Sequence, residues 1–92
     1  MKSLISNDKR CFKCGTTYNI HRHHIFEGKN RNNSEKYGLW VYLCGKHHNL
    51  SNEGVHFNKE FDKELKKLGQ QRFEENYPSI DFISIFHKNY KD

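Results

Sequence analysis

The sequence predicts a small α+β domain in which helices follow a two-stranded β-hairpin. Two segments between residues 16 and 43 are rich in β-branched and aromatic residues, which favours strands. In the C-terminal half, apolar residues recur at spacings of three and four, which favours helices. Of the 92 residues, 34% are hydrophobic and 29% are charged, so we expect one domain whose core is too small to be stabilised by packing alone.

The first strand follows a tight turn. We expect residues 1–10 to be a polar lead-in and residues 11–15 to form that turn. Residues 16–25 contain several β-branched and aromatic side chains, which predicts the strand.

The second strand follows a loop. Residues 27–36 are mostly Gly, Asn, Ser and charged residues, which predicts a polar loop. From residue 37 to residue 43 large apolar side chains alternate, which predicts a strand that ends at Cys44. A helix is expected to begin at His47.

Helices are predicted for the rest of the chain. Asn58 is a suitable N-cap for a long helix, which we expect Gly69 to interrupt and Pro78 to end. Ser79 or Asp81 is the expected cap of a last short helix. The apolar side chains of both helices are predicted to pack on the hairpin rather than to bind a cofactor: Phe61, Leu65, Leu68, Phe73, Tyr77, Phe82, Ile85 and Phe86. Residues 1–92 would thus be a single domain, with a core of residues 11–57 and a helical cover of residues 58–92.

Charge and cysteine content restrict the class of protein. Residues 1–46 carry nine Lys and Arg against three Asp and Glu, a balance of +6, whereas residues 47–92 have a balance of −1. A basic half suits a phosphate backbone, although an ordinary solvated surface explains it equally well. Three cysteines exclude a complete disulfide framework. Neither a signal peptide nor a transmembrane span is recognisable, so we expect a cytoplasmic protein without membrane contact.

Two pairs of metal-ligand residues bracket the predicted hairpin. Cys11-x-x-Cys14 precedes the first strand, and Cys44-x-x-His47 follows the second. Two residues between ligands let one turn present both to an ion, and four such ligands complete a tetrahedral zinc site. A redox pair shares the first spacing, but the second pair favours zinc. Four protein ligands leave no open position, so this zinc is predicted to be structural.

Histidines form a second group near the same segments. The chain has seven, and six of them follow one or the other predicted strand: His21, His23, His24, His47, His48 and His56. If His47 binds the structural zinc, the others remain on segments that the zinc holds together. Neutral imidazoles bind divalent metals, and an imidazole of ordinary pKa is a suitable general base at neutral pH.

These residues resemble a known family. His23-His24-Ile25, a polar loop, Val41-Tyr42-Leu43-Cys44 and His47-His48-Asn49 together resemble the HNH, or ββα-metal, nuclease motif. The stretch LCGKHHNLSNEGVH and the helix after it are similar to small zinc-containing HNH proteins of phages and prophages. The resemblance covers roughly residues 11–75. It implies a zinc-stapled ββα-metal (His-Me finger) fold and a metal-dependent DNA endonuclease that hydrolyses phosphodiester bonds.

The resemblance also implies residue roles. His24 would be the general base that activates water, and His23, His48 and His56 would hold one catalytic divalent ion. Imidazole ligands suit Mn²⁺, Ni²⁺, Co²⁺ or Zn²⁺ better than Mg²⁺. The products would carry 5′-phosphate and 3′-hydroxyl ends. Residues expected to bind the DNA backbone are Arg22, Lys29, Arg31 and Lys46.

The chain departs from the family pattern in two places. His47 stands where many relatives have cysteine, which zinc accepts equally well. The middle motif residue, usually Asn or His, is Leu39 or Gly38 here. Residues expected to brace the loop between the strands instead are Asn32, Asn33 or Ser34.

The last ligand of the catalytic ion has two possible identities. Gly54 and several turn formers predict a short helix after His48 and a turn that returns His56 to the ion. If the helix continues instead, Asn52 lies on the same face as His48 and replaces His56.

The alternative function is a zinc-stabilised DNA-binding or adaptor module without catalysis. It accounts for the four zinc ligands and the basic first half, but it gives the remaining histidines no role. A zinc-folded protein-interaction domain is a third hypothesis. A homodimer, which would matter for double-strand cleavage, stays open.

Overall fold

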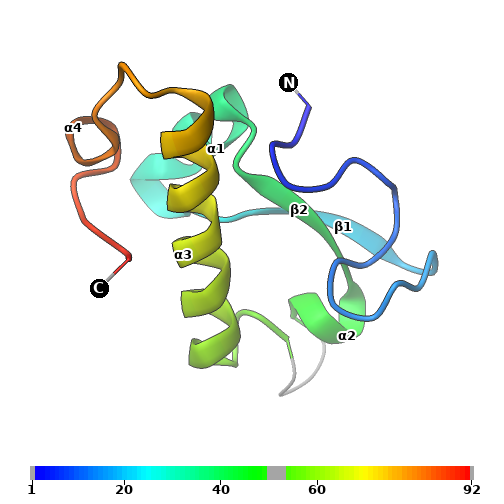
Figure 1. The fold of residues 1–92 in the computed structure, drawn as a ribbon. Coiled ribbons are helices and arrows are strands. Elements are labelled where there is room, and N and C mark those ends of the chain that lie inside the picture. The colour runs from blue at the N-terminus through cyan, green and yellow to red at the C-terminus, as the bar shows by residue number, and fades with distance from the viewer. Residues whose placement is uncertain (1, 50–53, 92) are drawn as a thin grey trace.

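The computed structural model describes residues 2–49 and 54–91 and has the predicted α+β class. A two-stranded antiparallel sheet forms the centre, α3 crosses it, and α4 lies beyond α3 (Figure 1). None of the helices in the described part has the length and apolar character needed to cross a bilayer. In chain order the elements are β1 (Ile20–His24), the 3-10 helix η1 (Gly28–Asn30), α1 (Arg31–Tyr37), β2 (Trp40–Cys44), α2 (Gly45–His48), α3 (Lys59–Asn76) and α4 (Phe82–Phe86).

The hairpin presents different residues on its two faces. Ile20 pairs with Cys44 and His24 pairs with Trp40, so His23 lies opposite Val41. Because side chains alternate along a strand, His23 shares a face with Val41 and His24 points to the other face. Val41 is fully buried in the core, and His23 is only 2% exposed. Two neighbouring histidines therefore lie in different environments.

The N-terminal segment packs on β2, so its prediction as a polar lead-in was wrong for the described residues. The hydroxyl of Ser3 donates to the carbonyl of Trp40 (2.5 Å), and the amide of Leu4 donates to that of Gly38 (2.8 Å). Leu4 and Ile5 contact the hydrophobic core. The segment supplies hydrogen-bond partners to backbone carbonyls at and before the start of β2.

The segment predicted as a loop, residues 27–36, instead contains η1 and most of α1. The buried hydroxyl of Ser34 donates to the carbonyl of Phe26 (2.7 Å) and accepts from its amide (3.0 Å), which holds α1 against the end of β1. Gly38 ends α1 in the left-handed region (φ 73°), a conformation that glycine adopts readily. Strand β2 therefore begins at Trp40 rather than at residue 37.

Helix boundaries follow the predicted caps, with two exceptions. Asn58 caps α3 through its side chain (3.1 Å from the Phe61 amide), and Asp81 rather than Ser79 caps α4, as its contact with the Ile83 amide shows. The expected break at Gly69 was wrong, because α3 is continuous from Lys59 to Asn76. Helix α2 begins at Gly45, two residues before the predicted start.

Gly69 lets α3 approach the hairpin closely. A Cβ atom at this position would lie 3.1 Å from the ring of Phe26 and 3.3 Å from the side chain of Ile25. The loss of helix propensity at glycine is thus offset by tight packing between α3 and the residues after β1. Gly69 therefore marks a close contact of α3 with the hairpin and not a break in the helix.

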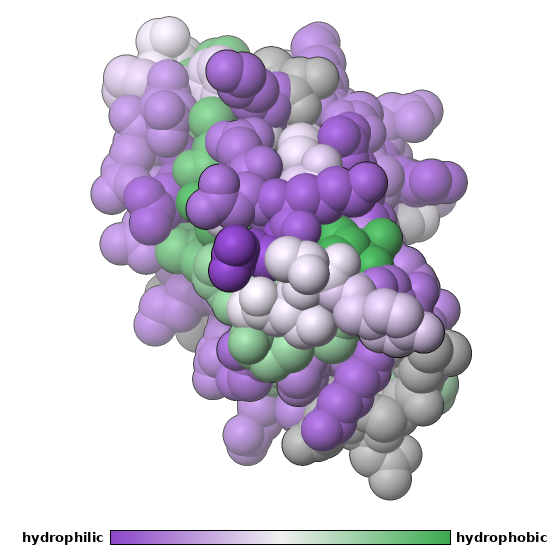
Figure 2. Space-filling model, turned by 90° about the vertical axis from the view of Figure 1, so that its right-hand side faces the viewer, coloured by the Kyte–Doolittle hydropathy of each residue, from purple (hydrophilic) through white to green (hydrophobic). Residues whose placement is uncertain are grey.

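Aromatic side chains make up much of the core. Phe73 of α3 packs against Phe82 and Phe86 of α4 and against Tyr37 of α1, with ring centroids 5.2–5.8 Å apart. Phe26 contacts both α4 rings from the hairpin side. The predicted packing role of Phe73, Phe82 and Phe86 is confirmed. The face drawn in Figure 2 is mostly hydrophilic, with small hydrophobic patches.

We expect Phe73→Ala to lower the free energy of unfolding by about 3–5 kcal/mol, because it removes a fully buried ring. Phe57→Ala is the matched control, since Phe57 is 64% exposed. The control should change stability by less than about 0.5 kcal/mol. Urea denaturation of the metal-loaded protein measures both values. Equal losses in the two variants would contradict the core described here.

Candidate functional site

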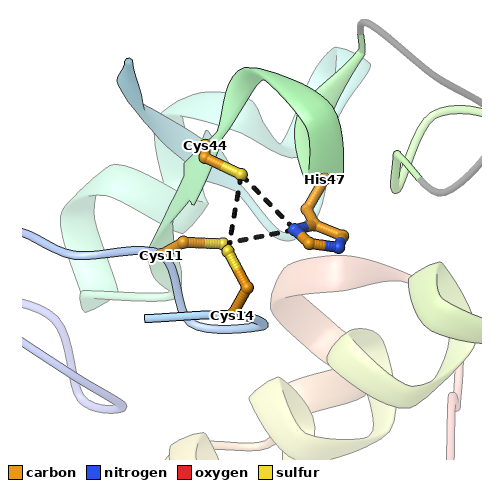
Figure 3. Close-up of side chains that lie close together, drawn as sticks. All are labelled: Cys11, Cys14, Cys44 and His47. Atoms are coloured by element: carbon orange, nitrogen blue, oxygen red, sulfur yellow. Dashed lines mark hydrogen bonds between the residues drawn. The ribbon is translucent and has the colours of Figure 1, made fainter. Parts of the chain in front are cut away.

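Four predicted zinc ligands meet at one end of the hairpin. Cys11, Cys14, Cys44 and His47 form the Cys₃His cluster, whose ligand atoms all lie within 4.8 Å of one another. Figure 3 shows the side chains converging from the turn before β1, the end of β2 and helix α2. The distance from Nδ1 of His47 is 3.3 Å to Sγ of Cys44 and 3.7 Å to Sγ of Cys11. Sulfurs around one tetrahedral zinc ion lie about 3.8 Å apart, so these separations suit one shared ion.

The local backbone prepares both half-sites. In the turn, the amide of Gly15 donates to the carbonyl of Cys11 (2.8 Å), and Gly15 has φ 79°. The amide of Phe12 donates to the carbonyl of Tyr42 (2.8 Å), which attaches the turn to β2. Cys44 is the residue directly before α2, so one helical turn carries its partner His47 back to the same point.

Thiol ionisation also suits a cation. Burial raises the pKa of the Cys11 thiol, but backbone groups of Cys44, Cys14 and Lys13 outweigh this effect and lower it to about 6. Burial raises the pKa of Cys44, and the neighbouring thiols add to that rise. One thiolate is thus readily formed, whereas further ionisation requires a positive charge nearby. The 3.8 Å between Sγ of Cys14 and of Cys44 is far longer than a disulfide bond of about 2.05 Å.

Three further histidines form a second group, the triple-histidine cluster of His23, His48 and His56. Their ligand nitrogens also lie within 4.8 Å of one another, and Nε2 of His48 is 3.1 Å from Nε2 of His56. The cluster borders a cavity of about 220 Å³. Residues lining this cavity are Arg22, His23, His24, Glu27, Arg31, His48 and His56.

His23 carries a buried nitrogen with an unmet hydrogen bond. Within the described residues, its Nε2 has no hydrogen-bond partner, and the nearest carboxylate oxygen, from Glu27, is 3.7 Å away. Burial, reinforced by neighbouring His48 and His56, lowers the pKa of His23 to about 3. Burial likewise lowers the pKa of His48 to about 4. Neutral imidazoles whose ligand nitrogens lie this close together are a suitable donor set for a divalent ion.

A turn after α2 brings His56 to this cluster. The amide of His56 donates to the carbonyl of His48 (3.2 Å), and the amide of Val55 donates to that of His47 (2.8 Å). The chain therefore folds back beside α2, which matches the expected turn that places His56 near His48. Asn52, the alternative ligand, lies outside the described residues.

Carboxylates border the same cluster, which sequence reasoning missed. Glu27 and Asp62 lie with His23 in a further group whose ligand atoms are within 4.8 Å of one another. Glu27 stands four residues after His23, a spacing that could have drawn attention to it. The site thus offers oxygen as well as nitrogen atoms that could bind an ion, and the sequence did not indicate the oxygen atoms.

His24 lies outside the cluster and pairs with a carboxylate. It is half-buried, and its Nε2 is 3.1 Å from Oε1 of Glu35. Nη1 of Arg22 contacts the same carboxylate at 2.9 Å, and its guanidinium stacks over Trp40 at 3.8 Å. The hydrogen bond from His24, followed by the one from Arg22, lowers the pKa of Glu35. Glu35 therefore stays ionised and holds the proton of His24 on Nε2. Sequence reasoning missed Glu35 because it was assigned to a loop.

The predicted backbone-binding residues divide into two sets. Arg22 and Arg31 line the cavity, whereas Lys29 in η1 and Lys46 in α2 are exposed and do not line it. Among the three residues proposed to brace the loop, Ser34 makes the buried contacts with Phe26.

The Cys₃His cluster is expected to bind one ion on which folding depends. Cys14→Ser should lose the tetrahedral thiolate spectrum of the Co²⁺-loaded protein and most of its folded structure, because metal binding and folding are coupled in a small core. Cys14 is exposed, so its packing contribution is small. Thr17→Ala, an exposed neighbour, is the control and should keep both. A folded, metal-free Cys14→Ser protein would overturn the assignment.

Acid should destabilise the protein through His23. Its pKa of about 3 lies below the ordinary value of 6.5, so between these values the unfolded chain binds a proton that the folded chain excludes. The stabilisation is therefore complete above pH 6.5 and is lost as pH falls toward 3. His23→Gln should lessen the fall in unfolding free energy by up to about 1.4 kcal/mol per pH unit, measured by urea titration. Parallel curves for parent and variant would contradict this prediction.

Comparison with known proteins adds no relative to this picture. No protein-family model, curated protein or solved structure matches the chain.

Proposed function

We propose that this protein is a metal-dependent DNA nuclease of the HNH, or ββα-metal, type. The observation that carries the proposal is the buried, uncharged His23, whose Nε2 has no hydrogen-bond partner among the described residues and whose ring is grouped with those of His48 and His56. An unpaired polar atom in a dry site costs about 1–3 kcal/mol, and a bound cation would remove this cost. Such a cost is typical of a site retained for function.

The two clusters would have different tasks. The Cys₃His cluster would hold a structural zinc ion, because four protein ligands leave no position for water or substrate. His23, His48 and His56 would hold a second divalent ion at the cavity, where substrate can enter. When bound, that ion supplies positive charge for the phosphate and for the leaving oxygen.

His24 is suited to act as the general base. Because Glu35 accepts the Nε2 proton, Nδ1 of His24 carries the lone pair that removes a proton from water. The resulting hydroxide attacks phosphorus as the bond to the 3′ oxygen breaks, and the leaving oxygen takes a proton from solvent water. The products then carry 5′-phosphate and 3′-hydroxyl ends. Glu35 also stabilises the positive charge that His24 acquires in this step, in the manner of a carboxylate–histidine pair.

Arginines at the cavity are suited to bind the phosphate. Arg22 and Arg31 both line it, and guanidinium groups form paired hydrogen bonds with phosphate oxygens. Stacking on Trp40 and the contact with Glu35 restrict the Arg22 side chain before substrate arrives. A DNA-binding module without catalysis would use these arginines, but it would give no reason for a buried His23 beside His48 and His56.

The proposal is tested by nicking of supercoiled plasmid with zinc-loaded protein, from which loosely bound metal has been removed. Adding Mn²⁺ or Ni²⁺ should start cleavage. We expect His24→Ala to lower the cleavage rate by about 10²–10⁴-fold, because the general base is lost, while Ni²⁺ affinity stays unchanged. His87→Asn, at an exposed position at the end of α4, is the control and should cleave normally.

Two results would count against the proposal. Cleavage at the parental rate by His24→Ala would mean that another residue is the base. Failure of the parent to cleave with any of these ions, despite bound Ni²⁺, would favour the binding module.

A further inference from the structure

Two residues outside the triple-histidine cluster, Asn19 and His21, are linked to His48 by hydrogen bonds. We propose that Asn19 and His21 form a hydrogen-bonded chain that fixes His48 as the Nδ1–H tautomer and turns its Nε2 lone pair toward His23 and His56. This inference rests on the ion site of the proposed function, but not on cleavage. His21 is a positioning residue here, because it acts through His48.

The chain has two links, both within hydrogen-bond distance. Nε2 of His21 lies 3.1 Å from Oδ1 of Asn19, and Nδ1 of His21 lies 2.9 Å from Nδ1 of His48. His21 stands two residues before His23 in β1, so the two share the face of the strand that meets α2. Each nitrogen of the His21 ring therefore has a defined partner.

The direction of both hydrogen bonds follows from the chemistry of the groups. The amide oxygen of Asn19 can only accept, so Nε2 of His21 must carry a hydrogen. A neutral imidazole has one N–H group, which leaves Nδ1 of His21 as an acceptor. The hydrogen between the two Nδ1 atoms must then belong to His48.

The consequence for His48 concerns its other nitrogen. A neutral imidazole carries a single hydrogen, so a hydrogen on Nδ1 of His48 leaves its Nε2 with a free lone pair. This Nε2 is 3.1 Å from Nε2 of His56, within the triple-histidine cluster. The hydrogen bonds from Asn19 through His21 thus select the tautomer of His48 that can bind an ion in the triple-histidine cluster.

Asn19 is suited to this position by its backbone as well. It has φ 53°, a left-handed conformation that Asn tolerates better than most residues. Its carbonyl accepts a hydrogen bond from the amide of Gly45 (3.0 Å), the first residue of α2. Asn19 therefore fixes both the helix that carries His48 and the ring that orients it.

The tautomers can be read without substrate or activity. Long-range ¹H–¹⁵N correlation spectra of the zinc-loaded protein, at mildly alkaline pH where imidazoles are neutral, distinguish Nδ1–H from Nε2–H rings. We expect His48 to be the Nδ1–H tautomer and His21 the Nε2–H tautomer. An Nε2–H ring at His48, or a mixture, would overturn the proposal.

Substitutions of His21 distinguish a role in orienting His48 from a role in packing alone. His21→Leu keeps most of the volume but offers no acceptor, so His48 should become a mixture of tautomers and Ni²⁺ affinity should fall about 10–100-fold. His21→Asn places an amide oxygen near the former Nδ1 and should restore most of the affinity. Calorimetric Ni²⁺ titration measures both, with His87→Asn as control.

Each outcome bears on one of the two proposals. Unchanged His48 tautomer and Ni²⁺ affinity in His21→Leu would reduce His21 to a packing residue. If His21→Leu does not fold, Asn19→Ala should weaken the same preference, and an unchanged His48 tautomer in that variant would overturn the chain. If the parent protein does not cleave plasmid but the tautomers are as expected, the nuclease proposal is overturned. The proposed hydrogen bonds from Asn19 through His21 to His48 then still stand.

Discussion

Convergence of the Cys₃His cluster is the constraint on which the rest of the structure depends. Helix α2 has only four residues, far fewer than an isolated helix needs to be stable in water. It is held at its start by the end of β2 and by Asn19, and His47 anchors it to the cluster. His48 is the next residue, so the position of the second cluster is set largely by the first.

The aromatic core and the Cys₃His cluster lie in different parts of the molecule. Phe26, Phe73, Phe82 and Phe86 pack where α3 and α4 meet the residues after β1, whereas the Cys₃His cluster lies at the opposite end of the hairpin. His23 lies between the two, with a nearly inaccessible side chain. The hairpin therefore links a region stabilised by packing to one whose clustered side chains could hold a cation.

Features encoded by local spacing were predictable, and those that depend on contacts between distant segments were not. The two Cys/His pairs each span one turn, and Asn58 caps the helix that directly follows it, so the sequence alone indicated both. Gly69 was misinterpreted because its role lies in a contact with Phe26, far away in the sequence. Residues 27–36 looked like a loop because their polar composition conceals the buried bonds of Ser34.

The side-chain contacts around the candidate sites that the sequence did not indicate share one property. Glu35, Asn19 and His21 contribute through hydrogen bonds to rings on other segments or on the other side of a turn. No spacing rule links Glu35 of α1 to His24 of β1. The histidine doublet was easy to find, but the alternation that separates its members, one toward the core and one toward Glu35, required the pairing of β1 with β2.

If both clusters bind an ion, the link between His47 and His48 makes the triple-histidine cluster depend on the Cys₃His cluster. Loss of the ion from the Cys₃His cluster would release α2 and so scatter the ligands of the triple-histidine cluster. An empty triple-histidine cluster would leave the four ligands of the other site in place. A chelator of graded strength would thus empty the sites in a fixed order. If both clusters bind ions, the protein would have a folded state in which only the Cys₃His cluster is loaded.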